Sequence, residues 1–133
     1  METEKYHVEI RGTKPLLMNA PNAAELDSRS IRRRSEIPGE EEEIEKRLYK
    51  DPSGNICIPA YVIKGAIRAE GRNYRAKQRK STYASLIRAG IDIEPEYIPL
   101  KYDELKVDKR VVSVRGSRIV RIRPRFDKWT LEL

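Results

Sequence analysis

The fold is decided by Ile56-Cys57-Ile58-Pro59-Ala60-Tyr61-Val62-Ile63-Lys64-Gly65-Ala66-Ile67-Arg68, one stretch of a 133-residue chain. The apolar run Ile56–Ile58 predicts a short buried strand, because Asp51–Asn55 before it has the residue types of a turn. Pro59 ends that strand, and the pattern after it predicts a helix from about Tyr61 to Lys80. The sequence therefore predicts an α+β domain in which an antiparallel sheet packs on one long helix.

Basic residues recur along one side of this predicted helix. Intervals of four, four, three and four residues separate them, so they share one helical face. They are Lys64, Arg68, Arg72, Arg75 and Arg79. Gly65 and Gly71 weaken the helix by about 1 kcal/mol each. Such glycines often permit another backbone to approach closely.

A β-hairpin is predicted near the C-terminus, with strands Val111–Val114 and Arg118–Phe126 and a turn at Arg115-Gly116-Ser117. Apolar and basic residues alternate along its second strand and so point to opposite faces. The apolar row is Val120, Ile122, Pro124 and Phe126, and the basic row is Arg121, Arg123 and Arg125. Neighbours in the basic row are about 6.6 Å apart, comparable with the phosphate spacing of an extended single strand. Alternatively, these arginines pair with acids of a neighbouring strand, such as Asp92, Glu94 and Glu96.

Shorter elements complete the expected single domain of residues 1–133. Alternation over Tyr6–Arg11 predicts a strand, and Trp129–Leu133 a last short strand. Glu40–Lys50 and Ser81–Ala89 are predicted as helices. Residues from about 19 to 40 are predicted to form a long mobile loop, because this stretch contains prolines, a glycine and a basic cluster.

The positive charge lies mainly in the second half of the chain. The formal net charge is +7, and charged residues make up 37% of the sequence, against a usual share of about 25%. Residues 61–90 contain eight Lys or Arg and one acid, and residues 101–133 contain ten and five, whereas the first sixty contain ten and twelve. This distribution favours a phosphate-binding surface. The alternative is a thermophile-like surface rich in ion pairs.

Few residues suggest catalysis, a metal or a cofactor, and none of the three is predicted. His7 is the lone histidine, Cys57 reads as a buried small residue, and nucleotide-binding and zinc-protease motifs are absent from the sequence. Asp27, in the long loop, is the only acid considered for RNA cleavage. The acidic start of the chain and the lack of a long apolar run predict a cytoplasmic protein that does not enter membranes.

The stretch Tyr49–Arg68 resembles the signature of the RAMP superfamily, the backbone subunits of CRISPR effector complexes. There a turn and a strand ending in Ile-Pro lead to a helix that opens with Lys-Gly-x-x-Arg, matched here by Lys64, Gly65 and Arg68. The resemblance implies a ferredoxin-like (RRM-like) fold that holds guide RNA near this helix start. In some members the long loop carries an RNA-cleaving aspartate, a region that Asp27 occupies here.

The chain also resembles small phage-encoded proteins with a Pro-Leu-Leu-Met start and an Arg-Ile-Val-Arg-x-Arg-Pro hairpin. The glycine-rich loop found in the C-terminal half of RAMP proteins is missing from this sequence. The resemblance therefore implies a shortened relative that completes its sheet by forming an oligomer.

Three hypotheses on function follow. The first is sequence-tolerant binding of RNA or single-stranded DNA, as a subunit of a homo-oligomer or larger complex and not as an independent enzyme. The residues expected to contact phosphates are Lys64, Arg68, Arg72, Arg75, Arg121, Arg123 and Arg125. The aromatic residues that could stack on bases are Tyr61, Tyr74, Tyr83, Tyr102 and Trp129. The second hypothesis is a metal-assisted endoribonuclease that uses Asp27. The third is an assembly protein whose basic face meets an acidic partner.

Overall fold

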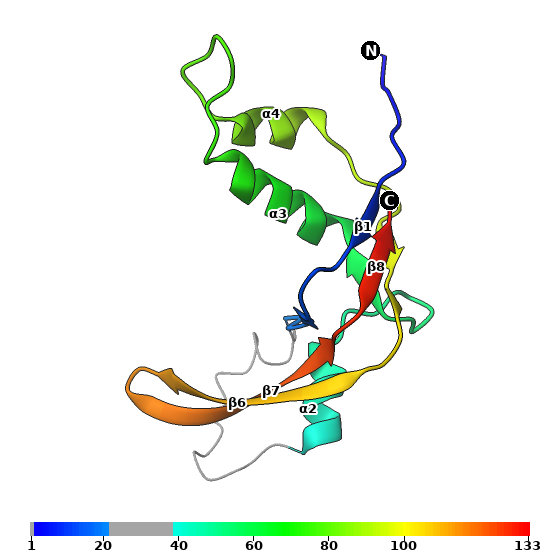
Figure 1. Ribbon diagram of the computed structural model, residues 1–133, viewed down its shortest axis with the longest axis vertical. Coiled ribbons are helices and arrows are strands. Elements are labelled where there is room, and N and C mark those ends of the chain that lie inside the picture. The colour runs from blue at the N-terminus through cyan, green and yellow to red at the C-terminus, as the bar shows by residue number, and fades with distance from the viewer. Residues whose placement is uncertain (1, 22–38) are drawn as a thin grey trace. The chain divides into compact units, whose positions relative to one another are not determined.

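A computed structural model describes residues 2–21 and 39–133 of the chain. Along the described residues the elements are β1 (Glu9–Arg11), β2 (Leu16–Leu17), α2 (Glu40–Arg47), β3 (Cys57–Pro59), α3 (Ala60–Gly71), α4 (Tyr83–Gly90), β4 (Tyr97–Pro99), β5 (Lys101–Tyr102), β6 (Lys106–Val114), β7 (Ser117–Phe126) and β8 (Trp129–Glu132). The strands form antiparallel sheets with the orders β1-β8-β5, β2-β7-β6 and β3-β4 (Figure 1). The predicted α+β class is confirmed.

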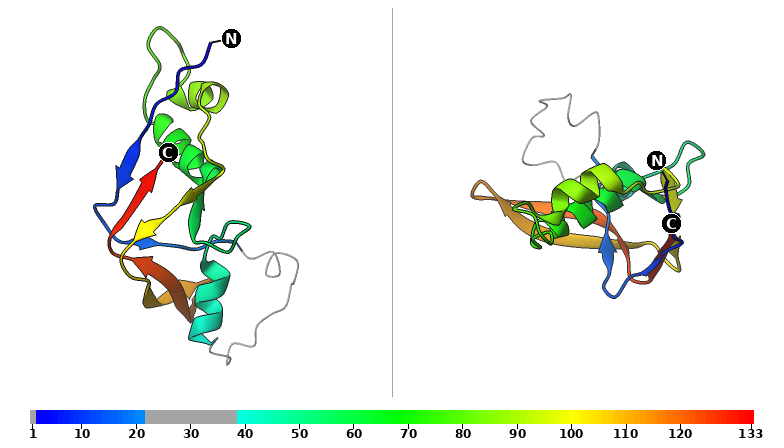
Figure 2. Two further views of the ribbon diagram at one scale, coloured as in Figure 1. Left: turned by 90° about the vertical axis from the view of Figure 1, so that its right-hand side faces the viewer. Right: turned by 90° about the horizontal axis from the view of Figure 1, so that it is seen from above.

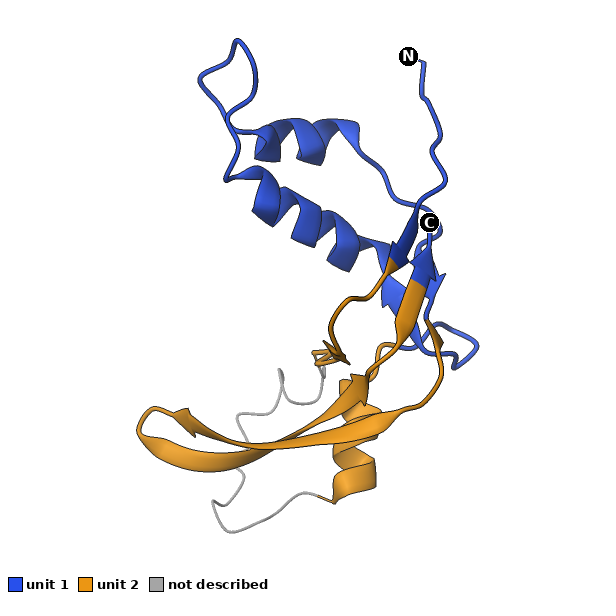
Figure 3. Cartoon of the chain, in the orientation of Figure 1, with its two compact units in different colours: residues 1–10, 50–100, 131–133 blue, residues 11–49, 101–130 orange. Residues whose placement is uncertain are grey.

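The chain divides into two compact units, each built from separate segments (Figure 3). Unit 1 comprises Met1–Ile10, Lys50–Leu100 and Leu131–Leu133, and unit 2 comprises Arg11–Tyr49 and Lys101–Thr130. The division falls within β1 and β8, so both strands contribute residues to both units.

The core of unit 1 is built around the paired strands β3 and β4. Cys57 lies opposite Pro99 and Ile58 opposite Ile98. Cys57, Ile58 and Ile98 are buried together with Leu100 and Leu131, whereas Pro99 is exposed. The predicted turn before β3 is confirmed. The backbone N–H of Asn55 donates to Oδ1 of Asp51 at 2.8 Å, and Gly54 takes the left-handed φ of +86° that such a turn requires.

The long helix predicted to reach Lys80 is wrong, because α3 ends at Gly71. Gly71 is buried where α4 crosses the end of α3, and a Cβ added there would lie 2.5 Å from Cδ1 of Ile87. The chain then folds back, and the N–H of Tyr83 donates to the carbonyl of Tyr74 at 3.0 Å. The two helices lie side by side as a helical hairpin (Figures 1 and 2). The second short helix predicted over residues 81–89 is confirmed as α4.

Unit 2 contains the predicted β-hairpin, now seen to be longer. Its turn consists of two residues, Arg115 with φ 51° and Gly116 with φ 79°. Two positive φ values are the signature of a type I′ turn, whose twist suits a two-residue hairpin. The first strand begins at Lys106, five residues before the predicted start at Val111.

The hairpin packs its apolar row on α2 and on the segment after β2. Ile122, Pro124 and Phe126 are buried, and the side chains buried with them in unit 2 include Met18, Ile44 and Leu48. Val120, nearest the turn in the same row, is 45% exposed. Pro124 is tolerated in this central strand because the N–H that proline lacks would point toward the β2 side and not toward β6. Its carbonyl points to the same side and accepts from the N–H of Met18 at 3.0 Å.

The predicted last strand is confirmed as β8, whose Trp129 and Thr130 pair with Tyr102 and Lys101 of β5. The Tyr102 ring meets Phe126 edge-on, with ring centroids 4.9 Å apart. Most of the loop expected at residues 19–40 lies outside the described residues, and so does Asp27. Among the helices described, none has the length and apolar character needed to cross a bilayer.

Candidate nucleic-acid interface

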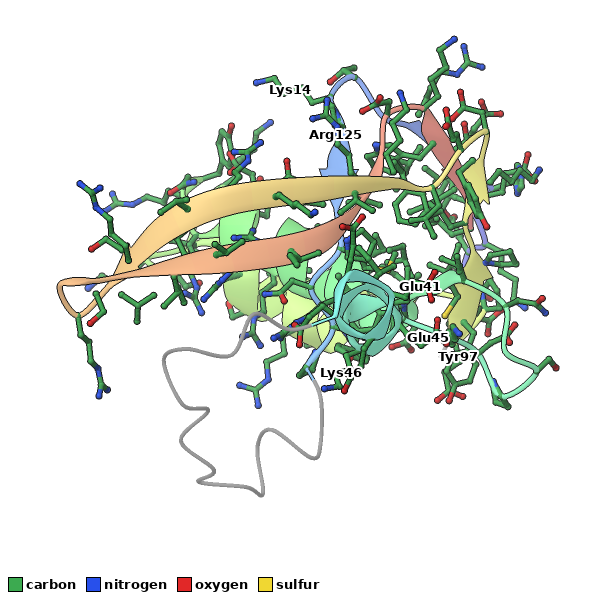
Figure 4. All side chains as sticks on the ribbon, turned by 90° about the horizontal axis from the view of Figure 1, so that it is seen from below. Lys14, Glu41, Glu45, Lys46, Tyr97 and Arg125 are labelled. Carbon is green, nitrogen blue, oxygen red and sulfur yellow. The ribbon has the colours of Figure 1, made fainter. Side chains whose placement is uncertain are left out.

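The register of the hairpin gathers charged residues of both strands on one face. Arg125 lies opposite Lys106, Arg123 opposite Asp108, and Arg121 opposite Arg110. Directly opposed residues of an antiparallel pair point to the same side. The resulting arginine face consists of Lys106, Asp108, Arg110, Arg121, Arg123 and Arg125. In Figure 4, Arg125 and Glu41 of α2 lie on opposite sides of the hairpin. The arginine face is therefore the side that α2 leaves open.

Two aspartates hold the basal end of this face together. Oδ1 of Asp127 accepts from Nε of Arg125 at 2.6 Å, and its Oδ2 accepts from Nζ of Lys106 at 2.7 Å. These hydrogen bonds, first from Lys106 and then from Arg125, hold the pKa of Asp127 below its usual value. The bond to Asp127 raises the pKa of Lys106. Arg125 is thereby fixed in place beside its neighbours.

Asp108 is the second aspartate and the only acid on the arginine face. It is buried, although it projects from the open side of the hairpin. Its Oδ2 lies 3.1 Å from Nε of Arg110, and its Oδ1 lies 4.0 Å from a terminal nitrogen of Arg125. Arginine side chains therefore cover this carboxylate. The negative charge of Asp108 offsets one of the positive charges of these arginines.

Two of the three acids proposed from the sequence as partners of these arginines, Asp92 and Glu94, pair elsewhere. Asp92 lies 3.6 Å from Nζ of Lys64, and Glu94 lies 3.6 Å from Nζ of Lys5. All four of these residues belong to unit 1. The acidic partners of Arg125 are instead Asp108 and Asp127, which flank it within unit 2.

Arg121 and Arg123 are the members of the face that keep an unneutralised guanidinium. Both side chains are half-buried along β7, and within the described part of the chain neither lies within 4.0 Å of a carboxylate. Five cations face two acids here, once Asp127 is counted with Asp108. A half-buried guanidinium that has five fixed donors and forms no ion pair is suited to bind an anion such as a phosphate.

The basic residues predicted on the long helix are separated by the early end of α3. Lys64 and Arg68 lie four residues apart on α3 and are half-buried. Arg72 is the C-cap residue of α3. Arg75 lies in the following loop, where its backbone forms an isolated β-bridge with Thr82. The single basic face predicted from Lys64 to Arg79 is therefore wrong beyond Gly71. These four residues lie in unit 1, and the hairpin arginines lie in unit 2.

Sequence reasoning missed the contribution of β6 to the arginine face. Lys106, Asp108 and Arg110 were outside the predicted strand, because the run from Lys106 to Arg110 contains one apolar residue. A signal was nevertheless present, since these three charged residues recur at period two directly before the apolar run of Val111 and Val112.

The lone histidine and the lone cysteine of the sequence both belong to unit 1. His7 is exposed and precedes β1. Cys57 is buried as predicted, and burial, reinforced by the charge of Asp51, raises the pKa of its thiol. Within residues 2–21 and 39–133, no three His, Cys, Asp or Glu side chains come together as metal ligands.

Comparison of the chain with protein-family models, with curated proteins and with solved structures found no match in any of the three.

Proposed function

We propose that the chain binds single-stranded nucleic acid in a sequence-tolerant manner, as a subunit of a larger nucleoprotein assembly. The observation that carries the proposal is the pair Arg121 and Arg123, two half-buried guanidinium groups in one row that form no ion pair with the described residues. A preference for RNA, a ferredoxin-like arrangement of the sheet and a cytoplasmic location belong to the same proposal. They derive from the RAMP resemblance of Tyr49–Arg68 and from the composition.

The spacing of the row favours an extended strand as its ligand. Alternate residues of a β-strand are about 6.6 Å apart, so Arg121, Arg123 and Arg125 meet successive phosphates of a stretched single strand. Contacts to phosphates carry no base information, and binding of this kind tolerates any sequence. Release of condensed counterions makes such binding weaken steeply as salt rises.

A second set of phosphate contacts is assigned to unit 1. Lys64 and Arg68 occupy the helix start that matches the Lys-Gly-x-x-Arg pattern, and Arg72 and Arg75 follow at the exposed end of α3. Lys64 is already engaged with Asp92, whose side chain is fully exposed. An exposed pair of this kind contributes little to stability, so a phosphate competes effectively for the lysine.

The direct test is the affinity for fluorescently labelled RNA, single-stranded DNA and duplex DNA, measured across a range of salt. Wild-type protein is expected to bind the single strands, with an affinity that falls as salt rises. The double variant Arg121→Gln/Arg123→Gln is expected to bind more weakly, and its salt slope is expected to flatten by about 0.7 per lost contact.

The matched control is Arg115→Gln/Arg118→Gln, which removes the same charge from the same hairpin. Arg115 lies in the turn, and Arg118 lies opposite Ser113 on the other face. Equal losses in both double variants would show that net charge alone attracts the ligand. An affinity that does not change with salt would contradict the proposal and favour an acidic protein as the partner.

A further inference from the structure

A shallow hollow in unit 2 lies at the end of the paired strands β5 and β8. Its volume is about 290 Å³, near the lower end of the roughly 300–1,000 Å³ of small-molecule sites. Its lining consists of Lys101, Tyr102, Asp103, Lys128, Trp129 and Thr130. Two aromatic residues and two lysines thus border one open depression, which is large enough for one planar ring.

The aromatic walls of this hollow are fixed by contacts behind them. The indole Nε1 of Trp129 donates to the carbonyl of Lys14 at 2.9 Å, and the ring lies against Gly12, where a side chain would collide with it. Tyr102 rests edge-on against the buried ring of Phe126, yet the residue remains 42% exposed. Rings that are already ordered lose little entropy when a ligand packs on them.

The polar groups around the hollow match a nucleotide rather than an apolar ligand. Lys101 and Lys128 supply positive charge beside the rings, as a phosphate requires. Asp103 supplies an acceptor, although its Oδ1 also takes the N–H of Glu104 at 2.8 Å. An aromatic surface next to cations is the usual combination at sites for single-stranded nucleic acid.

The hollow continues the arginine face along the chain. Arg125, the basal member of that face, is four residues from Trp129 and is tied to Asp127 between them. A strand spans at most about 3.4 Å per residue, so the two sites lie within the reach of two or three nucleotides. A backbone that follows the arginine row brings a base of the same strand to the hollow.

We propose that this hollow stacks one unpaired nucleobase of the strand whose phosphates lie on the arginine face. The inference rests on the proposed function and adds to it a reason for selecting single strands. Bases in a duplex are stacked and paired, so none can enter without being flipped out. The assignment turns Tyr102 and Trp129 into base-contacting residues, while the arginine face contacts phosphates only.

The chain offers a direct reporter, because Trp129 is its only tryptophan. The experiment compares a labelled oligothymidylate with an abasic strand of the same length, recording the anisotropy of the label and the fluorescence of Trp129. The base-bearing strand is expected to quench the tryptophan and to bind about 5- to 150-fold more tightly. The abasic strand is expected to bind in a salt-dependent way without quenching.

Three variants locate the effect. Tyr102→Leu is expected to lose the preference for the base-bearing strand while its affinity for the abasic strand is unchanged, and Tyr102→Phe is expected to keep the preference. Tyr6→Leu, at an exposed tyrosine of unit 1, is the control and is expected to behave as wild type. If Tyr102→Leu does not fold, the two strands still decide the matter on the wild-type protein.

The outcomes separate the two proposals. Equal affinity of wild-type protein for the two strands would overturn base stacking and leave phosphate binding intact. A preference that survives Tyr102→Leu would overturn the assignment to this hollow. If neither strand binds at low salt, the proposed function fails together with the inference.

Discussion

The indole of Trp129 occupies the space that a side chain at Gly12 would need. A Cβ built on Gly12 would lie 2.1 Å from Nε1 of Trp129 and 2.2 Å from its Cε2. The backbone N–H of Gly12 also donates to the carbonyl of Trp129 at 3.0 Å. This glycine is therefore required by close packing between two residues of unit 2 that lie far apart in the sequence.

Gly12→Ala is expected to destabilise the protein by about 1–3 kcal/mol, since the indole must move and give up its bond to Lys14. Thermal unfolding followed by circular dichroism measures the loss, and a shift of the Trp129 emission maximum reports the displaced ring. Gly90→Ala is the matched control, because nothing lies within 4 Å of a Cβ added there. Equal stability of the two variants would show that the indole yields without cost.

The ion cluster at the base of the hairpin predicts a pH dependence with a defined sign. Lys106 and Arg125 lower the pKa of Asp127 in the folded protein. A carboxyl with a lowered pKa stabilises the fold above its unfolded value of about 3.9 and loses that contribution as the pH falls through its folded value. The melting temperature of Asp127→Asn is therefore expected to lie below that of wild type near neutral pH.

This difference in melting temperature is expected to shrink as the pH falls below about 4. Glu96→Gln, at an exposed carboxylate of unit 1, controls for the loss of one negative charge. A difference between wild type and Asp127→Asn that stays constant down to acidic pH would mean that the hydrogen bonds, and not the charge of Asp127, stabilise the hairpin.

Asp108 is expected to stabilise the fold and to weaken the binding of nucleic acid to the arginine face. Asp108→Asn removes the buried charge that Arg110 and Arg125 cover, and it is expected to destabilise the fold by about 1–2 kcal/mol. The same change frees Arg110, while Arg125 keeps its hydrogen bond to Asp127, so affinity for single-stranded RNA is expected to rise and its salt slope to steepen. Chemical denaturation and labelled-RNA titration measure the two effects.

Glu41→Gln provides the comparison for this variant. It removes the same charge from α2 in unit 2, on the other side of the hairpin (Figure 4). A rise in RNA affinity as large as that of Asp108→Asn would assign the effect to net charge and remove the case for a binding face.

The sequence predicted the elements whose patterns are local. The turn at Asp51–Asn55, the strand before Pro59 and the presence of the last hairpin all follow from residue chemistry within a few positions. Alternation also placed Ile122, Pro124 and Phe126 on one face of their strand, and the structure buries all three. These features agree because each one is decided by residues close together in the chain.

The features that the sequence did not predict depend on contacts between distant residues. A glycine costs a helix about 1 kcal/mol, which does not by itself end one; α3 ends at Gly71 where Ile87 of α4 packs on it. The first half of β6 has almost no apolar pattern, because its row of charged residues faces the side of the hairpin that α2 does not cover. Asp108 is buried there by arginines of both strands and not by apolar side chains. Register across the hairpin created the arginine face, and periodicity within one strand showed only half of it.

Among the described residues β6 is the outer strand of its sheet, and this edge predicts self-association. In a two-residue hairpin the closing pair Val114–Ser117 is hydrogen-bonded, so alternate residues from Ser113 back to Val107 direct their backbone N–H and C=O outward. On this edge Val111 is 67% exposed and lies opposite Val120, also exposed. An open edge with exposed valines pairs readily with another strand.

Wild-type protein is therefore expected to form oligomers whose mass in light scattering rises with concentration. Val111→Lys is expected to shift the equilibrium toward the monomer, because a charge on an edge strand disfavours pairing. Tyr61→Lys makes the same type of change at an exposed apolar residue of α3, and it is expected to leave the mass unchanged. A wild-type protein that stays monomeric at high concentration would contradict this prediction.

A substitution at Gly65 tests whether RNA approaches the start of α3, because it is expected to change helix stability and RNA binding in opposite directions. It lies inside α3 with nothing within 4 Å of an added Cβ, so Gly65→Ala is expected to stabilise the protein by about 0.5–1 kcal/mol. If RNA binds α3 as proposed from the RAMP resemblance, its backbone passes close to this glycine, and an added methyl group is then expected to weaken RNA binding. Ala69→Gly, an exposed position one turn further along, is expected to lower stability without adding bulk. If Gly65→Ala raises the melting temperature and leaves RNA affinity unchanged, RNA does not approach α3 at this position, and the arginine face of unit 2 carries the binding without it.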